Sequence, residues 1–245
     1  MFVAWGIVLF VWGYEVFVTD GFFYWAFPKA NVDMTFFWEN LIFLSGFSRI
    51  SAVLPGLPFA YSLLEERNSG FLRIDIYRES SGRYIRRKLL YVIVSGMIVI
   101  IVPYLLINIP IMAVTHPTDP ETCHSIIREK VWGKILFIWG GKLYLILQGM
   151  IFALYGALWA LIVLAVTLFV RNKYIAFVIP FIINVISKDF ITGKLNSYTD
   201  TELWWRGDIK GKSIVVSFMY YIVPIVLIAV FITWMFKRQV RNGRI

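Results

Sequence analysis

The sequence predicts an all-α integral membrane protein with six transmembrane helices, and three observations point to this class. Of the 245 residues, 59% are hydrophobic and only 16% are charged, whereas about a quarter of the residues of a soluble domain carry charge. The mean hydropathy of +0.72 points the same way. Apolar runs of the length that crosses a bilayer, roughly 20 residues in a helix, recur along the whole chain.

The apolar runs define the expected elements, which together form a single transmembrane domain over residues 1–245. The spans are expected at about 2–18, 41–64, 89–114, 144–170, 174–190 and 213–236. Prolines inside these runs do not exclude helices, because neighbouring helices in a membrane satisfy the carbonyls that a proline frees. The first run has no basic leader and no cleavage-site pattern, so we expect a span there and not a signal peptide.

Lys and Arg residues predict the orientation, because cytoplasmic loops carry an excess of both. They gather between the second and third spans, in "RNK" at 171–173 and in the C-terminal "KRQVRNGRI". These segments alternate as expected for six spans with both termini in the cytoplasm, in a multi-pass protein of the cell membrane. The formal net charge of +9 therefore follows from topology and needs no nucleic acid partner.

The stretch "LLEERNSGFLRIDIYRESSGRYIRRKLL" at 63–90 is highly charged between two apolar runs. Paired acids begin it, a glycine follows, and apolar residues stand among the charges. This mixture predicts a short amphipathic helix on the membrane surface. Its basic end, with Arg83, Arg86 and Arg87, would suit lipid headgroups. Alternatively, Phe71 and Leu72 would anchor the segment in a groove of a cytoplasmic partner.

Two polar segments partly match known motifs, but neither predicts a catalytic site. "GDIKGKS" at 207–213 lacks the first glycine of a phosphate-binding loop, because Arg206 stands there. The loop "HPTDPETCH" offers five potential metal ligands, but their spacing matches no strong zinc pattern. These ligands are His116, Asp119, Glu121, Cys123 and His124. Since no nucleophile–base set appears either, we expect no enzyme activity, no metal and no cofactor bound by this chain.

Arg49 lies inside the second expected span, within "LSGFSRISAVLPGLP" at 44–58. A buried arginine in a membrane is costly, so it marks a possible translocation path or gate. The alternative is an arginine that reaches outward to the interface or pairs with a neighbouring acid such as Glu39.

The fourth expected span carries small residues at four-residue intervals, a spacing that lets helices approach closely. They are Gly149, Ala153 and Ala157, with Gly156 and Ala160 beside them. This pattern favours helix packing within one chain over a seam between two chains.

Two stretches resemble the permeases of the ABC-2 (type V) exporter class. "EERNSGFLRIDIYRESSGRYIRRKLL" at 65–90 resembles their first cytoplasmic loop, where a coupling helix rests on the ATPase. "GALWALIVLAVTLFVRNKYIAFVIPF" at 156–181 resembles their fourth span, short basic turn and fifth span. The likeness covers most of the chain as topology and is specific only in these two stretches. One difference is that the family usually has an amphipathic helix before the first span, whereas this sequence begins in the apolar run.

The resemblance implies a permease subunit of an ATP-driven exporter in a bacterial cytoplasmic membrane, surrounded by lipids. Two copies of a separate ATPase subunit would bind ATP and Mg²⁺, and a second permease chain, identical or related, would complete the path. The cargo would be amphipathic, lipid-like or a peptide. Coupling to the ATPase would fall to Glu65, Glu66, Arg67, Gly70, Phe71, Leu72 and Arg73. The rival interpretation is a non-transporting sensor or scaffold that docks a cytoplasmic partner.

Overall fold

The computed structural model describes residues 1–14, 50–114, 117, 135, 137–191, 199–206 and 213–242, and it builds them from helices and turns. The α-helices are α1 (Phe2–Tyr14), α5 (Ser62–Ser69), α6 (Phe71–Arg78), α7 (Ser81–Val114), α9 (Lys142–Phe169), α10 (Lys173–Val185), α12 (Thr201–Arg206) and α13 (Ile214–Arg241). Shorter helical turns are η2 (Leu54–Gly56), η3 (Ile138–Gly141) and the π-helix η4 (Ile186–Phe190). Within these residues there is no strand, which confirms the predicted all-α class for the described part.

Three helical stretches are long and apolar enough to cross a membrane, and they support a transmembrane protein. They are Ser81–Pro110, Ile138–Phe169 and Ile214–Arg241, which match the third, fourth and sixth expected spans. Helices α1 and α10 match the first and fifth, but each has only 13 residues. The count of six spans and the cytoplasmic position of both termini remain predictions.

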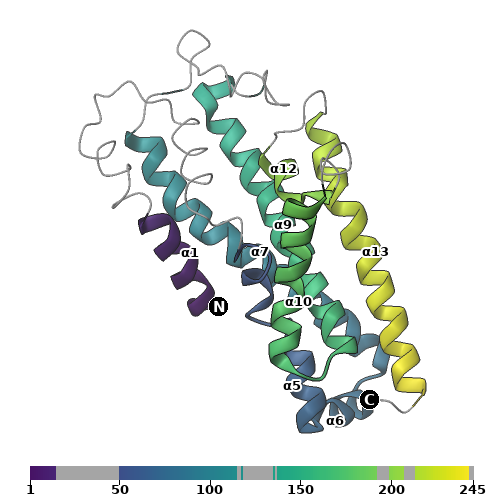
Figure 1. Cartoon of the computed structure of the whole chain (residues 1–245). Helices are drawn as coiled ribbons and strands as arrows, with labels where there is room; N and C mark the ends of the chain where they lie inside the picture. The colour runs from purple at the N-terminus through teal and green to yellow at the C-terminus, as the bar shows by residue number, and fades with distance from the viewer. Residues whose placement is uncertain are drawn as a thin grey trace.

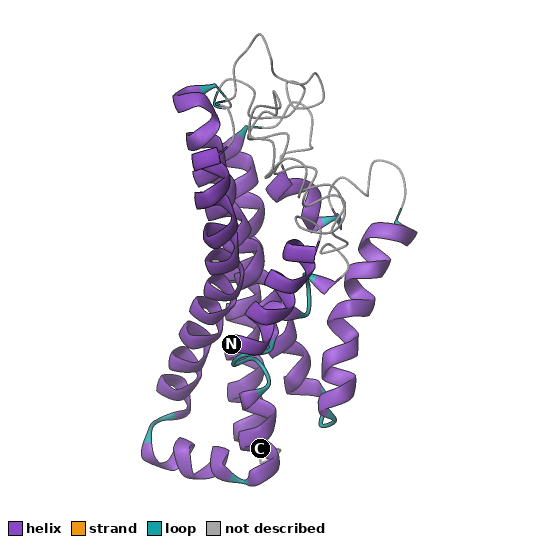
Figure 2. Cartoon of the chain, turned by 90° about the vertical axis from the view of Figure 1, so that its left-hand side faces the viewer, coloured by secondary structure: helices purple, strands orange, loops and turns teal. Residues whose placement is uncertain are grey.

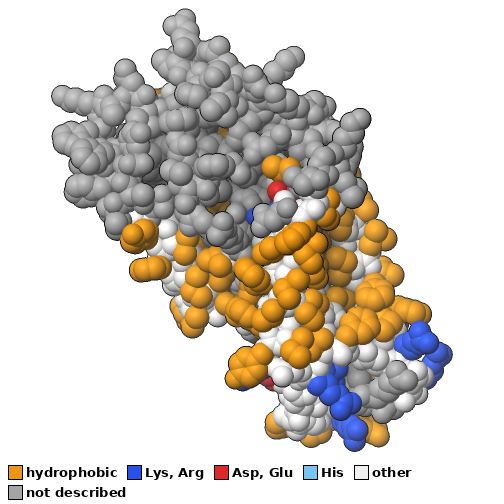
Figure 3. All heavy atoms as spheres, in the orientation of Figure 1, with side chains coloured by type: hydrophobic (Ala, Val, Ile, Leu, Met, Phe, Trp, Pro, Cys, Tyr) orange, Lys and Arg blue, Asp and Glu red, His pale blue; other side chains and the backbone are white. Residues whose placement is uncertain are grey.

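Helix α9 forms the centre of the molecule (Figure 1). Its most apolar stretch is largely buried, whereas that of α13 is largely exposed, and α7, α10, α12 and α13 all contact it. Phe152, Tyr155 and Trp159 of α9 belong to the main apolar core. Apolar side chains also cover the outer surfaces of the long helices (Figure 3). A helix that is hydrophobic all round suits a membrane span.

Small residues let α7 and α9 pack closely. A Cβ atom on Gly156 would clash with the carbonyl oxygen of Gly96 in α7, and a Cβ on Gly96 would lie 2.6 Å from the Cβ of Ala160. A Cβ on Gly149 would lie 2.7 Å from the ring of Tyr104. The other two members of the small-residue stripe, Ala153 and Ala157, are buried as well. In this structure the stripe therefore takes part in packing within the chain.

The second expected span, 41–64, is not a continuous helix in its described part. From residue 51 to residue 61 the chain forms turns and the 3-10 helix η2, and regular helix resumes only with α5. Pro55 and Pro58 explain the break, because neither has the N–H group that an α-helix needs. Residues 51–56 are buried against the bundle, and non-helical backbone at membrane depth is tolerated where protein covers it.

The segment 65–88, expected as a loop between two spans, is helical almost throughout. Helix α5 runs to Ser69 and α6 follows directly. Helix α7 then begins at Ser81, so the basic run "RYIRRK" forms its first turns. Arg and Lys are good helix formers, and no proline interrupts α7 before Pro103. The long helix thus starts eight residues before the expected span.

Candidate functional site at the corner of α5 and α6

Two short helices form a corner at one end of the bundle. Gly70 joins them with φ of +80°, which ends α5 in a left-handed conformation. A Cβ on Gly70 would meet nothing within 4 Å, so the backbone conformation, and not lack of space, favours glycine there. Figure 2 shows α6 lying across the end of the molecule, crosswise to the long helices. The corner thus brings together the predicted coupling residues from Glu65 to Arg73.

Glu66 fastens the corner to α7. Its carboxylate accepts a 2.6 Å hydrogen bond from Nζ of Lys88 and another from the hydroxyl of Tyr84. The ring of Tyr84 in turn stacks on Phe236 of α13, with 5.5 Å between the ring centroids. The side chain of Lys88 is only 9% exposed. A buried charge is costly without a partner, so Lys88 favours contact with Glu66. The ion pair links α5 to α7, and the ring of Tyr84 extends the link to α13.

Arg67 fastens the corner to the end of α9. Its guanidinium donates a 3.2 Å bond to the carbonyl of Leu168 and a 2.7 Å bond to that of Val170. The last carbonyls of a helix have no partner within the helix, and Arg67 supplies donors to them. Burial, and then the positive charge of Arg171, lower the pKa of the Arg67 guanidinium. The two bonds that the guanidinium donates hold α5 against the end of α9.

Leu72 points into the protein. It is 1% exposed and packs in the apolar cluster that also holds Tyr84, Leu168 and Phe236. It therefore anchors α6 to its own bundle, and the outward contact expected of it falls to other side chains.

The outward surface of α6 carries a row of apolar side chains among exposed basic ones. Phe71 is 62% exposed, Ile74 is 48% exposed and Tyr77 is 93% exposed. These residues are spaced by three, so they lie along one side of the helix; we call them the outer face of α6. Arg73 and Glu65 are exposed beside the corner. The sequence prediction did not include Tyr77, although its spacing from Phe71 and Ile74 was the signal that marks it.

Basic residues gather at the same end as the corner (Figure 3). They come from three segments that are distant in sequence: the corner with the start of α7, the turn between α9 and α10, and the end of α13. Close approaches join these segments, since Gln239 donates to the carbonyl oxygen of Leu168 at 3.0 Å and a Cβ on Gly82 would lie 3.6 Å from Lys237. Described members of the group are Arg67, Arg73, Arg78, Arg83, Arg86, Arg87, Lys88, Arg171, Lys173, Lys237, Arg238 and Arg241.

Polar contacts around α9 form a second feature, which the sequence prediction missed. Tyr155 shares a hydrogen bond with Ser51. The indole of Trp159 donates to the hydroxyl of Thr201 at 3.3 Å, and the hydroxyl of Tyr221 donates to the backbone carbonyl of the same threonine. These bonds tie the turn before η2, α12 and α13 to the central helix. Hydrogen bonds between helices are a normal means of packing in membranes.

Several other sequence predictions lie outside the described residues. Arg49, the possible path or gate residue, is one. The five potential metal ligands of the loop 116–124 and the segment 207–212 are others. Within the part of the chain that the structure describes, no group of three or more His, Cys, Asp or Glu side chains is placed to hold a metal ion.

The fold and the corner define a helical membrane protein with a short crosswise helix clamped to one end. Comparison of the chain with family models, with curated proteins and with solved structures finds no match.

Proposed function

We propose that this chain is the permease subunit of an ATP-driven exporter of the ABC-2 (type V) class, and that a separate ATPase subunit docks on its corner. One observation carries the proposal. The corner is fixed to the basic end of the bundle by Glu66 and Arg67 of α5 and by Leu72 of α6, yet α6 turns an apolar outer face away from the bundle. Buried anchors of this kind, aromatic residues above all, concentrate the binding energy of protein interfaces.

The clamps would pass movement of the ATPase into the membrane. A push on α6 reaches α7 through the Glu66–Lys88 ion pair and α9 through the bonds from Arg67 to Leu168 and Val170. Because α9 contacts most of the other helices, a shift at its end changes their packing. Such a link between nucleotide binding and the spans is a conformational coupling between distant sites.

The assembly we propose contains two permease chains, identical or related, and two ATPase subunits that bind ATP and Mg²⁺. The cargo would be amphipathic, lipid-like or a peptide, in keeping with a chain in which 18% of the residues are aromatic. Arg49 remains a candidate path or gate residue.

Copurification from native membranes tests the docking. We expect the wild-type chain to bring down an ATPase subunit that contains a nucleotide-binding phosphate loop. Phe71→Ala with Tyr77→Ala should reduce its recovery about tenfold or more, since hot-spot truncation costs about 2 kcal/mol. The matched control is Phe177→Ala with Tyr174→Ala on the exposed side of α10, which should recover as much ATPase as wild type.

The rival function, a sensor or scaffold, predicts another outcome of the same experiment. The outer face of α6 would then retain a partner without a nucleotide-binding loop, and ATP would not change the conformation of the spans. Recovery of such a partner alone would reject the exporter proposal.

Cysteine labelling tests the orientation. Ser69 and Ser80 are exposed near the corner, and Ser213 is exposed at the start of α13. In a Cys123→Ser background, we expect an impermeant thiol reagent to label Ser213→Cys in intact cells and to spare Ser69→Cys and Ser80→Cys. Labelling of the corner from outside would reverse the predicted topology.

A further inference from the structure

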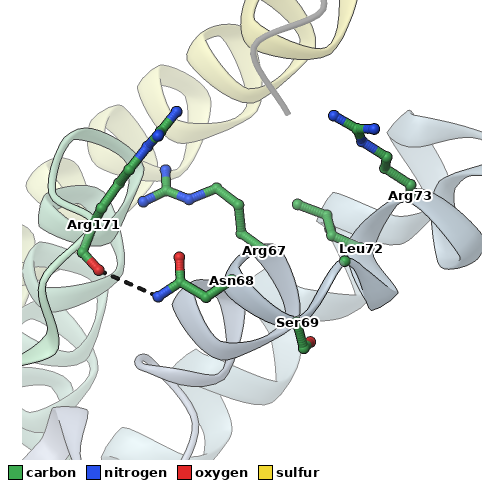
Figure 4. A pocket seen from close by; sticks show the side chains of 7 residues that line it. Arg67, Asn68, Ser69, Leu72, Arg73 and Arg171 are labelled. Carbon is green, nitrogen blue, oxygen red and sulfur yellow. Dashed lines mark hydrogen bonds between the residues drawn. The ribbon is translucent and has the colours of Figure 1, made fainter.

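A basic hollow lies between the corner and the turn that joins α9 to α10. Its volume is about 450 Å³. Figure 4 shows Arg73 and Arg171 on opposite sides of Arg67, and Arg171 comes from the turn after α9. Asn68, Ser69, Gly70 and Leu72 complete the lining. Two segments about 100 residues apart in sequence therefore build one concave site.

The positive charge in this hollow is not neutralised by the described residues around it. Among the described residues, three guanidinium groups line the hollow and no carboxylate does. The nearby acids Glu66 and Glu79 are paired elsewhere, with Lys88 and Arg87. Like charges brought together in this way repel one another, and a bound anion relieves that repulsion.

The three arginines differ in whether their side chains already bind the protein. Both terminal nitrogens of Arg67 already donate to backbone carbonyls, so Arg67 contributes mainly charge. Arg73 and Arg171 are exposed and form no side-chain hydrogen bond or ion pair with any residue that the structure describes. Their guanidinium groups are the available donors, and a planar fork of N–H groups matches phosphate oxygens well.

We infer that this hollow binds a phosphate group and that its source is the headgroup of an anionic phospholipid. The position argues for lipid over a soluble anion. Arg171 stands between Phe169 and Tyr174, which are exposed at the adjoining ends of α9 and α10, and Lys173 lies over the Tyr174 ring at 5.7 Å. Exposed aromatic residues beside basic ones are typical of the membrane–water interface. Basic pockets between helices at this depth bind lipid headgroups.

Such a lipid would join Arg73 of α6 to Arg171 of the α9–α10 turn. It would thus add a third fastening of the corner, beside those made by Glu66 and Arg67. The inference does not rest on the proposed transport function, because the binding needs neither an ATPase nor a cargo.

The test is lipid retention by the purified full chain, measured by native mass spectrometry with phosphatidylglycerol and phosphatidylcholine as probes. For Arg73→Gln with Arg171→Gln we expect the preference for phosphatidylglycerol to fall about tenfold. The matched control, Arg78→Gln with Arg241→Gln, removes the same charge from exposed positions outside the hollow and should keep the preference. Arg73→Lys with Arg171→Lys keeps both positive charges and should keep much of the preference for phosphatidylglycerol. This variant therefore tests the site even if the glutamine variant folds poorly.

Three outcomes would overturn the inference. The first is an equal loss of preference in both glutamine variants, which would indicate general surface charge. The second is an unchanged preference for phosphatidylglycerol in Arg73→Gln with Arg171→Gln. This outcome counts against the inference even if the same variant no longer binds a protein partner. The third comes from titration with inorganic phosphate: if phosphate binds wild type through these arginines and phosphatidylglycerol does not, the source is a soluble anion.

Discussion

Helices α5 and α6 are consecutive, have eight residues each, and use their side chains in opposite ways. In α5 the charged residues Glu66 and Arg67 bind the protein's own helices. In α6 the apolar residues Phe71, Ile74 and Tyr77 turn outward. This charge-rich segment thus contains one helix that binds the rest of the bundle and one that exposes apolar residues to its surroundings.

The cause of this difference is the position of each helix. Helix α5 meets the end of α9, where carbonyl groups need donors, and it meets Lys88, which needs a partner. Charged side chains therefore stabilise its inner side. Helix α6 lies across the end of the bundle, where the buried Leu72 and the partly buried Ile76 hold it. Its exposed apolar residues are left for a partner.

The largest effect on stability is expected from Arg67→Met, which removes the clamp to α9. It leaves the carbonyls of Leu168 and Val170 without their charged donor. Hydrogen bonds to charged groups contribute about 1.5–3 kcal/mol, so we expect a loss of about 2 kcal/mol and a clear fall in Tm in detergent. Arg78→Met, at an exposed position of α6 outside the hollow, is the matched control and should change stability by less than about 0.5 kcal/mol. Equal falls in Tm would show that the charged residues of α5 and α6 do not differ in their contribution to stability.

A slightly smaller effect is expected from Glu66→Gln. The change removes the ion pair with Lys88, whose side chain is 9% exposed, although the amide can still bond to Tyr84. A loss of about 1–2 kcal/mol follows from leaving a partly buried charge without its counter-ion. Glu65→Gln changes an exposed residue and should leave Tm unaltered. Thermal unfolding of both variants, measured side by side, decides whether the two adjacent acids differ as the structure indicates.

Much of this comparison could be predicted from sequence, but not all of it. The charged stretch, its short crosswise helix and its place beside a long apolar helix follow from composition and resemblance. The inward direction of Glu66, Arg67 and Leu72 does not, because it depends on the end of α9, about 100 residues away. Local periodicity cannot show which partner a side chain meets in the folded chain.

An intermediate effect is expected from Gly70→Ala at the joint between the helices. The φ of +80° is unfavourable for a residue with a Cβ, by about 1–2 kcal/mol, and strain relief would turn α6 relative to α5. Gly82→Ala is the control, since its nearest neighbour would be the flexible Lys237 side chain at 3.6 Å. We expect lower Tm for the first variant and equal or higher Tm for the second. The reverse order would show that the left-handed joint is unimportant.

The smallest effect on stability is expected from Phe71→Ala with Tyr77→Ala, because exposed side chains contribute little to folding. We expect Tm to stay within about 2 °C of wild type, corresponding to about 0.5 kcal/mol for a chain of this size. Ile76→Ala, which alters a partly buried residue of the same helix, should lower Tm more. A larger fall for the outer face would mean that it packs within the protein.

The second expected span shows a different limit of sequence reading. Its hydrophobicity predicted one helix over 41–64, yet the described part turns around Pro55 and Pro58. Proline is accepted in membrane helices when neighbours satisfy the freed groups, so hydropathy alone does not separate a kinked helix from a broken one. Gly56 also approaches α9 closely, since a Cβ on it would lie 2.7 Å from a methyl group of Val163. That contact belongs to tertiary packing, which the hydropathy of the segment does not encode.

Photo-crosslinking from Tyr77 in native membranes tests the central claim most directly, namely that the outer face of α6 docks an ATPase. A photoreactive amino acid in place of Tyr77, which is 93% exposed, is compared with the same substitution at Trp234 on the exposed side of α13. The account predicts that position 77 forms a covalent adduct with an ATPase subunit that contains a nucleotide-binding phosphate loop, and that position 234 does not. Adducts from position 77 that contain only lipid, or only a protein without such a loop, would contradict it.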